Sequence, residues 1–241
     1  MAQYDFPREL QQSFETDIVG GALAKGQWFS FADLQSRYHA NQTDLSRVLF
    51  AAFRKGLIDK GTADAVGILG KSKPAIKSVF QHAAISGLSA KSLVRAVEVV
   101  PASALVAQKL GLAEGTLVFR QIRTRLVNDE IIANQNNYIP IEVCPGLETV
   151  DLTHSSFQET LEGRFYAVVA DLDEHFEIRP GTAQDVHVLG LEAGANVLVV
   201  QRLSLSSNQL PLVWADIHIR TDRYHYVREL WPEAAALLHG K

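Results

Sequence analysis

Two stretches of this chain, Val97–Arg123 (VEVVPASALVAQKLGLAEGTLVFRQIR) and Phe176–Arg202 (FEIRPGTAQDVHVLGLEAGANVLVVQR), are variants of one pattern. Their prolines, Leu-Gly-Leu triplets, turn glycines and final arginines all align at a constant offset of 79 residues, without a gap. Self-similarity at a fixed offset is the signature of a structural unit used more than once. The sequence therefore predicts a second domain built from two copies of one unit.

Each copy is expected to form a strand, a short helix started by proline, a stop at Leu-Gly-Leu and a long β-hairpin. We place the helices at residues 103–110 and 183–189, because Gly111 and Gly190 follow them where a left-handed C-cap favours glycine. The hairpin strands are expected at 117–126, 131–139, 197–206 and 212–220. Two such units predict one antiparallel sheet about a pseudo-twofold axis, with helices covering one face and a ligand cleft where the halves meet.

Ahead of the repeats, the chain carries three helical patterns. We expect helices at residues 8–24, at 31–39 after the N-cap Ser30, and at 42–55 after the N-cap Asn41. A glycine-punctuated extended stretch follows from Leu57. This outline fits a winged helix-turn-helix, and it fits a three-helix bundle without a DNA partner equally well.

A DNA-binding winged helix-turn-helix needs polar side chains on the first exposed turn of its third helix, where they reach base edges in the major groove. Candidates for DNA contact are Ser30, Asn41, Gln42, Thr43 and Arg47. The net charge of the whole chain is −4. Eight basic and eight acidic residues balance before residue 72, so DNA binding requires basic groups gathered on one face and implies a modest electrostatic contribution.

With 47% hydrophobic and 21% charged residues, the 241-residue chain has the composition of an ordinary globular protein. No apolar run approaches the roughly 18 residues of a membrane span, and the start of the chain lacks a signal-peptide pattern. We therefore expect a cytoplasmic protein.

Cys144 is the one cysteine of the sequence. It is either a nucleophile or a small buried apolar residue, and we favour burial. The scattered histidines, His218 among them, lack metal-ligand spacing.

The N-terminal segment resembles the GntR family of bacterial repressors. The resemblance depends on the spacing of Gly21, Gly26, Ser30, Leu34, Phe53 and Gly56-Leu57-Ile58. Two arginines that the family carries at and near the recognition helix are absent here, where Asn41-Gln42 and Ser46 stand. This departure implies an operator different from the family's usual one.

The second domain resembles the UTRA domain, the effector-sensing half of the HutC subfamily of GntR regulators, whose fold is that of chorismate lyase. The resemblance spans about residues 77–227 and depends on the Leu-Gly-Leu triplets, Arg123-Thr124-Arg125, Tyr138-Ile139-Pro140, Pro145-Gly146-Leu147 and Arg220-Thr221-Asp222-Arg223-Tyr224. It implies an α+β chain with a winged helix-turn-helix at 1–69, a linker at 70–76 and a UTRA domain at 77–241.

In family members that bind phosphorylated sugars, two arginines and a serine hold the anion, and the matching residues here are Arg123, Arg125 and Ser156. Paired guanidinium groups suit a phosphate, phosphonate or carboxylate. Alternatively, both arginines lie on a solvated strand face or pair with Asp171, Asp173 or Glu174. Trp214 either forms the floor of the pocket or packs in the core.

The family's pocket glutamates are replaced, one of them by Gln135, which we include in the candidate effector site. A less acidic pocket is poorly suited to sugar hydroxyls. We therefore expect an organophosphonate, a phosphate ester other than a sugar phosphate, or an organic acid.

Together these features predict a DNA-binding transcription regulator, a repressor without a cofactor, that binds a double-stranded operator as a homodimer and responds to a small anion. The first alternative is a ligand sensor that has lost DNA binding and acts through protein contacts. The second is a chorismate lyase-like enzyme, but no carboxylate stands at Gln135 or Val213 to act as a general acid.

Overall fold

The computed structural model describes residues 6–60, 65–70, 88–152, 157–223 and 225–226. The N-terminal part contains three helices, α1 (Arg8–Val19), α2 (Phe31–Tyr38) and α3 (Gln42–Arg54), and a small antiparallel sheet in the order β1-β3-β2, made of β1 (Trp28–Ser30), β2 (Ile58–Lys60) and β3 (Ala65–Ile68). Three helices followed by a hairpin form a winged helix-turn-helix, which decides between the two folds that the sequence left open.

Local chemistry sets the ends of these helices. The first helix stops at Val19, earlier than predicted, because Gly20 begins a turn and Gly21 adopts a φ of +83°. Ser30 and Asn41 cap α2 and α3 as predicted, each accepting a hydrogen bond from a backbone N–H of the first turn. The strand β1 was not predicted, because three residues are too few to show an alternating pattern.

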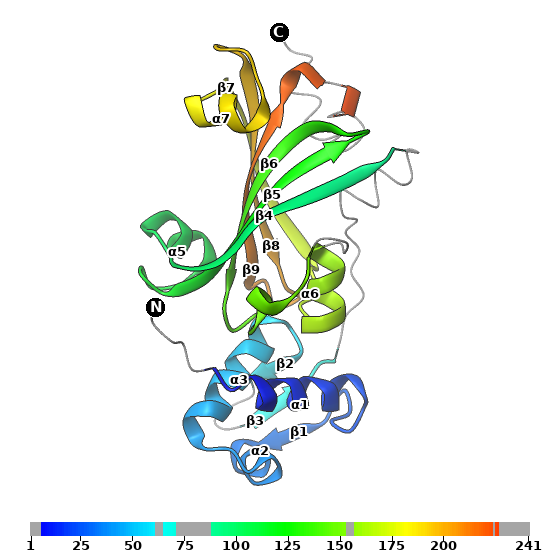
Figure 1. Cartoon of the computed structure of the whole chain (residues 1–241). Coiled ribbons are helices and arrows are strands. Elements are labelled where there is room, and N and C mark those ends of the chain that lie inside the picture. The colour runs from blue at the N-terminus through cyan, green and yellow to red at the C-terminus, as the bar shows by residue number, and fades with distance from the viewer. Residues whose placement is uncertain (1–5, 61–64, 71–87, 153–156, 224, 227–241) are drawn as a thin grey trace.

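The larger part contains one six-stranded antiparallel sheet in the order β4-β5-β6-β9-β8-β7 (Figure 1). Its strands are β4 (Ala90–Pro101), β5 (Leu117–Val127), β6 (Glu130–Pro140), β7 (Asp171–Pro180), β8 (Asn196–Leu205) and β9 (Pro211–Arg220). The first repeat supplies β4 to β6 and the second supplies β7 to β9. Because the order of the second half is reversed and β6 pairs with β9, the predicted sheet with pseudo-twofold symmetry is confirmed.

The short helices of the repeats, α5 (Ala104–Leu110) and α7 (Ala183–Leu189), lie within one residue of their predicted places and end at Gly111 and Gly190, whose φ values are +63° and +64°. The prediction that proline starts them is wrong, because the prolines end β4 and β7 and the side chains of Ser103 and Thr182 cap the helices. The remaining elements are α6 (Phe157–Phe165) and two 3₁₀ turns, η1 (Leu147–Thr149) and η2 (Thr221–Arg223). None of the described helices has the length and apolar character needed to cross a bilayer.

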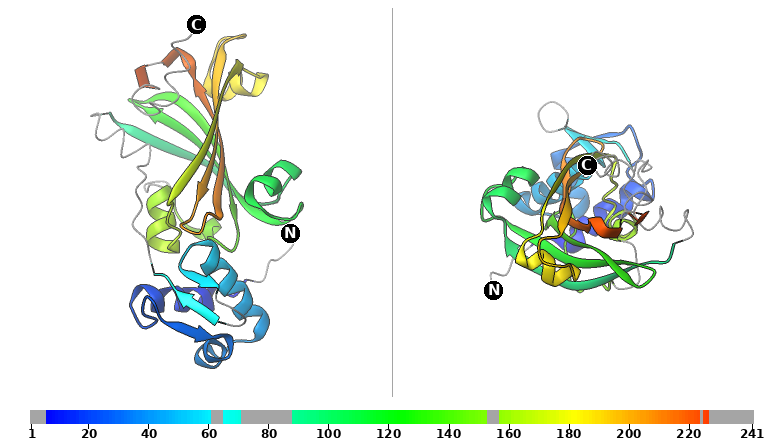
Figure 2. Two further views of the ribbon diagram at one scale, coloured as in Figure 1. Left: turned by 180° about the vertical axis from the view of Figure 1, so that it is seen from behind. Right: turned by 90° about the horizontal axis from the view of Figure 1, so that it is seen from above.

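The prediction that helices cover only one face of the sheet is wrong. The helix α5 packs in one cluster with Val118 and Trp214, whereas α6 packs in another with Phe119. Successive strand residues point to opposite faces, so α5 and α6 lie on opposite sides of the sheet (Figure 2). The repeat could not reveal this, because α6 belongs to the connection between the two copies.

The two parts of the molecule meet at the C-terminal end of α3, which faces the lower end of the large sheet (Figure 1). The Arg54 guanidinium donates to the carbonyl oxygens of Leu110 and Pro211, at 3.2 and 2.9 Å. The Asn208 amide, in the β8–β9 turn, donates to the carbonyl oxygens of Phe53 and Ile58, at 2.9 and 3.1 Å. Residues 71–76 of the predicted linker lie outside the described residues, as does the stretch IKSVFQHAAISG (76–87), whose pattern predicts a helix, so the boundaries at 69 and 77 stay predictions.

Candidate functional site

The face of the sheet that carries α6 also carries a band of polar side chains between two apolar clusters. Gln121, Arg123 and Arg125 alternate along β5 and therefore share this face. In the adjacent strand β6, Gln135 lies opposite Arg123, and Asn137 lies opposite Gln121. The structure thus brings together three of the four predicted effector residues.

Arg125 begins a chain of hydrogen bonds to neutral groups. Its guanidinium donates through Nε and Nη2 to Gln135 Oε1, at 3.1 and 3.0 Å, and through Nη1 to Ser92 Oγ at 2.8 Å. The Gln135 amide donates to Asn137, whose amide donates in turn to Gln121, at 2.7 and 2.9 Å. Gln135 therefore orients Arg125 without neutralising its charge, whereas a carboxylate at this position would neutralise it.

Arg123 is the largest fully buried side chain among the described residues, with 0% of its surface exposed. None of its three guanidinium nitrogens has a hydrogen-bond partner in the described part of the chain, and its Cζ lies over the Phe157 ring, 5.9 Å from the ring centroid. Burial lowers the pKa of Arg123 to about 10, so it remains protonated at neutral pH. Burial, followed by repulsion from Arg123 and Arg202, also lowers the pKa of Arg125. A buried cation without an acceptor is costly, and a bound anion would remove that cost.

In the second repeat, the protein itself supplies a carboxylate partner to the equivalent arginine. Arg202, the counterpart of Arg123, donates through Nε to Glu174 Oε1 at 2.6 Å. Glu174 lies opposite Arg202 across β7 and β8, whereas Val94 occupies the matching place opposite Arg123. Neither alternative that the sequence left open for Arg123 holds: its side chain is fully buried, and Glu174 pairs with Arg202 instead, so Arg123 has no carboxylate partner in the described residues.

Ser156, the fourth predicted effector residue, lies outside the described residues. The helix α6 is described from the next residue, Phe157, whose ring lies beside Arg123. Trp214 does not form the floor of this site, because it packs with α5 on the opposite face and stacks on Tyr138 with 5.4 Å between ring centroids. Cys144 is fully buried, as favoured from the sequence, and burial raises the pKa of its thiol.

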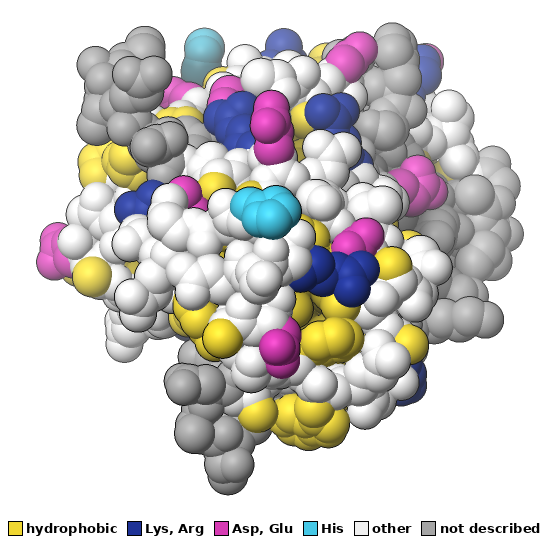
Figure 3. Space-filling view, turned by 90° about the horizontal axis from the view of Figure 1, so that it is seen from below, with side chains coloured by type: hydrophobic (Ala, Val, Ile, Leu, Met, Phe, Trp, Pro, Cys, Tyr) yellow, Lys and Arg dark blue, Asp and Glu magenta, His cyan; other side chains and the backbone are white. Residues whose placement is uncertain are grey.

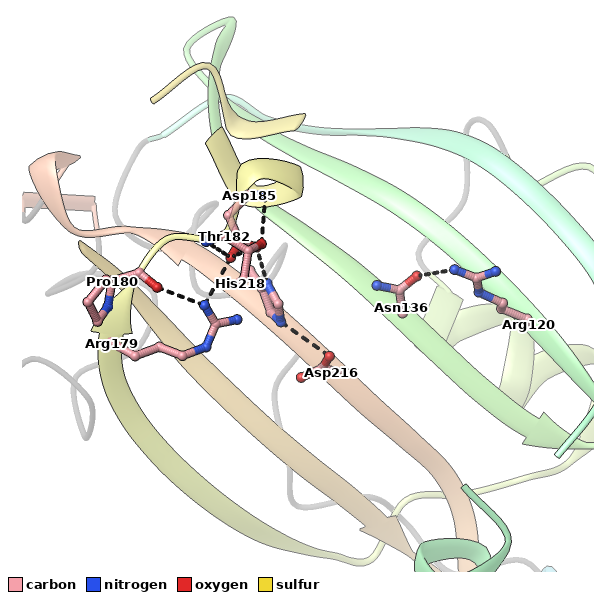
Figure 4. Close-up of polar contacts among 8 residues, drawn as sticks. All are labelled: Arg120, Asn136, Arg179, Pro180, Thr182, Asp185, Asp216 and His218. Atoms are coloured by element: carbon pink, nitrogen blue, oxygen red, sulfur yellow. Dashed lines mark hydrogen bonds and ion pairs between the residues drawn. The ribbon is translucent and has the colours of Figure 1, made fainter. Parts of the chain in front are cut away.

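A second polar group lies on the face that carries α7 (Figure 4). His218 contacts Asp185 through Nδ1 and Asp216 through Nε2, the latter at 3.2 Å. Arg179 and Thr182 also donate to Asp185. Burial acts to lower the pKa of His218, but its hydrogen bonds to Asp216 and Asp185 outweigh burial and raise it. The group fastens α7 to β9, and no metal-binding cluster occurs in the part of the chain that the structure describes.

The candidate DNA face is the outward side of α3 and its N-terminal turn. Asn41, Gln42, Thr43 and Arg47 are exposed there. Ser30 is exposed as well, but its hydroxyl already caps α2 by accepting from Asp33 N at 3.0 Å. Asn41 is similarly engaged: its oxygen accepts from Asp44 N at 2.9 Å, and its amide donates to the Asp44 carboxylate at 2.7 Å.

Basic charge around this face is sparse. Figure 3, a view of the lower end of the molecule, shows acidic, basic and apolar side chains interspersed. Arg37 pairs with Asp17, and Lys55 pairs with Glu15 inside the protein. Arg54 is buried against the large sheet, where it also lies 3.5 Å from Glu142. Of these two basic residues at the end of α3, Arg54 thus joins the two parts of the molecule, whereas Lys55 ties the end of α3 to α1 within the N-terminal part.

Comparison with known proteins identifies the family to which this architecture belongs. The family model described as the UTRA domain matches residues 86–225. The chain belongs to the UTRA-domain family. The HTH-type transcriptional repressor NagR of Bacillus subtilis is similar to it, with 23% identity over 91% of this chain and 92% of that protein. The HTH-type transcriptional regulator Rv0792c of Mycobacterium tuberculosis is 31% identical over 52% of this chain and 47% of that protein.

Among solved structures, PhnF from Mycobacterium smegmatis superposes with a TM-score of 0.58 at 16% identity, covering 89% of this chain and 95% of that one. At this identity the likeness shows the fold alone. The resemblance of this UTRA-domain protein to GntR regulators of the HutC subfamily is confirmed. It is a transcription regulator with an effector-binding domain and not an enzyme, since its relatives are regulators.

Proposed function

We propose that the outward side of α3 binds a double-stranded DNA operator, and that a small anion bound beside Arg123 and Arg125 controls this binding. The observation that carries the proposal is the buried guanidinium of Arg123, which lacks the carboxylate that its repeat counterpart Arg202 has in Glu174. A protein that keeps such a charge buried gains stability when an anion binds it.

The effector class follows from the neutral surroundings of the arginines. Gln135 does not neutralise the charge of Arg125, and Arg123 and Arg125 share one face of β5. An organophosphonate, a phosphate ester or an organic acid supplies the complementary charge, and a tetrahedral oxyanion offers the most acceptor atoms. Ser156 stays a predicted third contact.

For DNA, the proposal assigns base or backbone contacts to Gln42, Thr43 and Arg47 on the exposed side of α3. Ser30 and Asn41 contribute mainly by capping the helices that present them. Operators with twofold symmetry require two such domains, so we propose that the regulator acts as a homodimer, in the cytoplasm.

Fluorescence anisotropy with a labelled duplex from upstream of the protein's own gene tests the DNA part. Arg47→Ala is expected to weaken binding by about 1–3 kcal/mol, the usual cost of one specific contact. Lys91→Ala, which removes an equal charge at an exposed site on β4, should leave binding unchanged. Equal losses in both variants would argue against a DNA contact at Arg47.

The anion part is tested by adding methylphosphonate, glycerol phosphate or malonate to the same complex. We expect one class to change DNA affinity in the unmodified protein and to have no effect in Arg123→Gln. Anion binding that depends on Arg123, with no binding of any duplex, would instead support a ligand sensor that acts through protein contacts.

A further inference from the structure

One place in the large sheet has opposite chemistry in the two repeats. In each repeat, one residue of the edge strand lies directly opposite the arginine of the neighbouring strand, and we call its place the counter-charge position. In the second repeat it holds Glu174, opposite Arg202. In the first repeat it holds Val94, opposite Arg123. The second repeat thus supplies its arginine with a carboxylate, and the first supplies an apolar side chain.

A β-bulge in β4 creates this difference. The constant offset of 79 residues makes Arg95 the counterpart of the glutamate in the second repeat. The register of β4 on β5 shifts between Val94 and Ala96, so Arg95 falls between the paired positions. Its Nε donates to Thr124 Oγ1 at 3.1 Å, and Thr124 points to the face opposite that of Arg123. The bulge therefore turns another arginine away from Arg123 and leaves the counter-charge position apolar.

We propose that the anionic group of the effector occupies, beside Val94, the space that the Glu174 carboxylate occupies in the second repeat. This inference rests on the proposed function and adds where the charge of the ligand lies. One carboxylate from this direction suffices to pair an arginine of the sheet, since Glu174 reaches Arg202 Nε at 2.6 Å. Val94 is half-buried and packs against the cluster that contains Phe157, so the part of the ligand next to its charge should be apolar.

The same geometry predicts that a carboxylate built into β4 replaces the effector. Residues directly opposite each other on antiparallel strands have Cβ atoms about 4.5–5.5 Å apart. A glutamate at position 94 would therefore stand to Arg123 as Glu174 stands to Arg202. Because Arg123 is fully buried, a carboxylate attached to the neighbouring strand has the further advantage that it need not cross the protein surface. Val94→Glu should act as a built-in effector.

A double-mutant cycle on thermal unfolding of the full chain tests the pairing. With Arg123 present, we expect Val94→Glu to melt about 4 °C or more above Val94→Gln, because the carboxylate pairs the buried cation. In Arg123→Gln the order should reverse, because the same carboxylate is then buried without a partner. Leu93→Glu adds the charge on the opposite face, at a side chain that is 41% exposed, and its effect should not depend on Arg123. Equal melting of Val94→Glu and Val94→Gln with Arg123 present would overturn the proposal.

Operator affinity, measured by anisotropy, tests the same variants in function. Without added anion, Val94→Glu is expected to match the unmodified protein at saturating anion, and to respond no further to methylphosphonate, glycerol phosphate or malonate. Leu93→Glu should keep the full response. A full response in Val94→Glu would overturn this inference and leave the proposed function intact. If the unmodified protein responded to none of the three anions, the proposed function would fail, and this inference with it.

Discussion

Arg123 and Arg202 occupy equivalent positions in the two repeats, and they differ in whether the protein supplies their counter-charge. We predict opposite effects of the same substitution. Arg123→Met should stabilise the effector-free protein by about 1–3 kcal/mol, because it removes a buried unpaired cation. Arg202→Met should destabilise it by a similar amount, because it leaves the largely buried Glu174 without its partner.

Thermal unfolding without effector measures both changes, at about 2–4 °C per kcal/mol for a chain of this size. The two variants control for each other, since each replaces an arginine by methionine on the same face of the sheet. If Arg123→Met lowered the melting temperature as Arg202→Met does, the Arg123 charge would be satisfied without a ligand.

His218 gives a prediction for pH dependence. Its folded pKa is raised because hydrogen bonds to Asp216 and Asp185 outweigh burial. A raised pKa means that protonated His218 stabilises the fold below its unfolded pKa of 6.5, and that this stability is lost as pH rises through the folded value. We expect His218→Gln to destabilise the protein more at about pH 5.5 than at about pH 8.5.

Denaturant unfolding of both proteins at the two pH values checks this. His175→Gln is the control, because His175 is exposed on β7 and its replacement should cost the same at both pH values. A cost for His218→Gln that did not depend on pH would mean that His218 is not protonated in its site.

The sequence predicted that Arg123, Arg125 and Gln135 share a site, because alternation puts 123 and 125 on one face and the hairpin register brings 135 beside them. It could not predict which arginine stays unpaired. That depends on the strand pairing, which puts Glu174 opposite Arg202 and Val94 opposite Arg123; β4 carries no acidic residue near this place, since the counterpart of Glu174 in the first repeat is Arg95.

At the scale of elements, the β8–β9 turn holds the end of α3. Asn208 donates to two carbonyl oxygens there, of Phe53 and Ile58, and Gly56 approaches Ser207 so closely that an added Cβ would lie 2.1 Å from its hydroxyl oxygen. Because Asn208→Ala removes both hydrogen bonds, we predict that it loosens this contact, at a cost of about 1–2 kcal/mol.

Hydrogen exchange of the α3 amides measures the loosening, and we expect faster exchange toward Arg54 in Asn208→Ala than in the unmodified protein. Asn196→Ala is the matched control, since Asn196 is exposed at the start of β8, away from α3. If hydrogen exchange were unchanged in Asn208→Ala, Arg54 alone would hold the end of α3 against the large sheet.

Elements inside the repeats were predictable because each position has a second copy as a check: the Leu-Gly-Leu stops, the hairpins and their turns all lie near their predicted places. Elements outside the repeats were harder to place. The strand β1 gains its conformation from pairing with β3, and α6 takes its side of the sheet from Phe157 and Leu161 packing against Phe119. Both depend on tertiary contacts that no local pattern encodes.

At the scale of the whole molecule, the proposed function requires that an anion on the large sheet alters the presentation of α3. The described contacts offer a direct route, because Arg54 and Asn208 join the end of α3 to the strands β8 and β9. Coupling between two binding sites is reciprocal, and typical values are about 5–150-fold. If an anion changes operator affinity by a given factor, the operator must change anion affinity by that same factor.

We therefore predict that Asn208→Ala keeps both binding activities while its coupling factor falls toward one. Operator affinity measured by anisotropy with and without saturating anion gives the factor, and titration of the anion into protein alone and into the protein–DNA complex gives it independently. Asn196→Ala should keep the coupling factor of the unmodified protein. A coupling factor that stayed intact in Asn208→Ala would mean that the signal reaches α3 without this turn, through Arg54 or through the chain between the two parts.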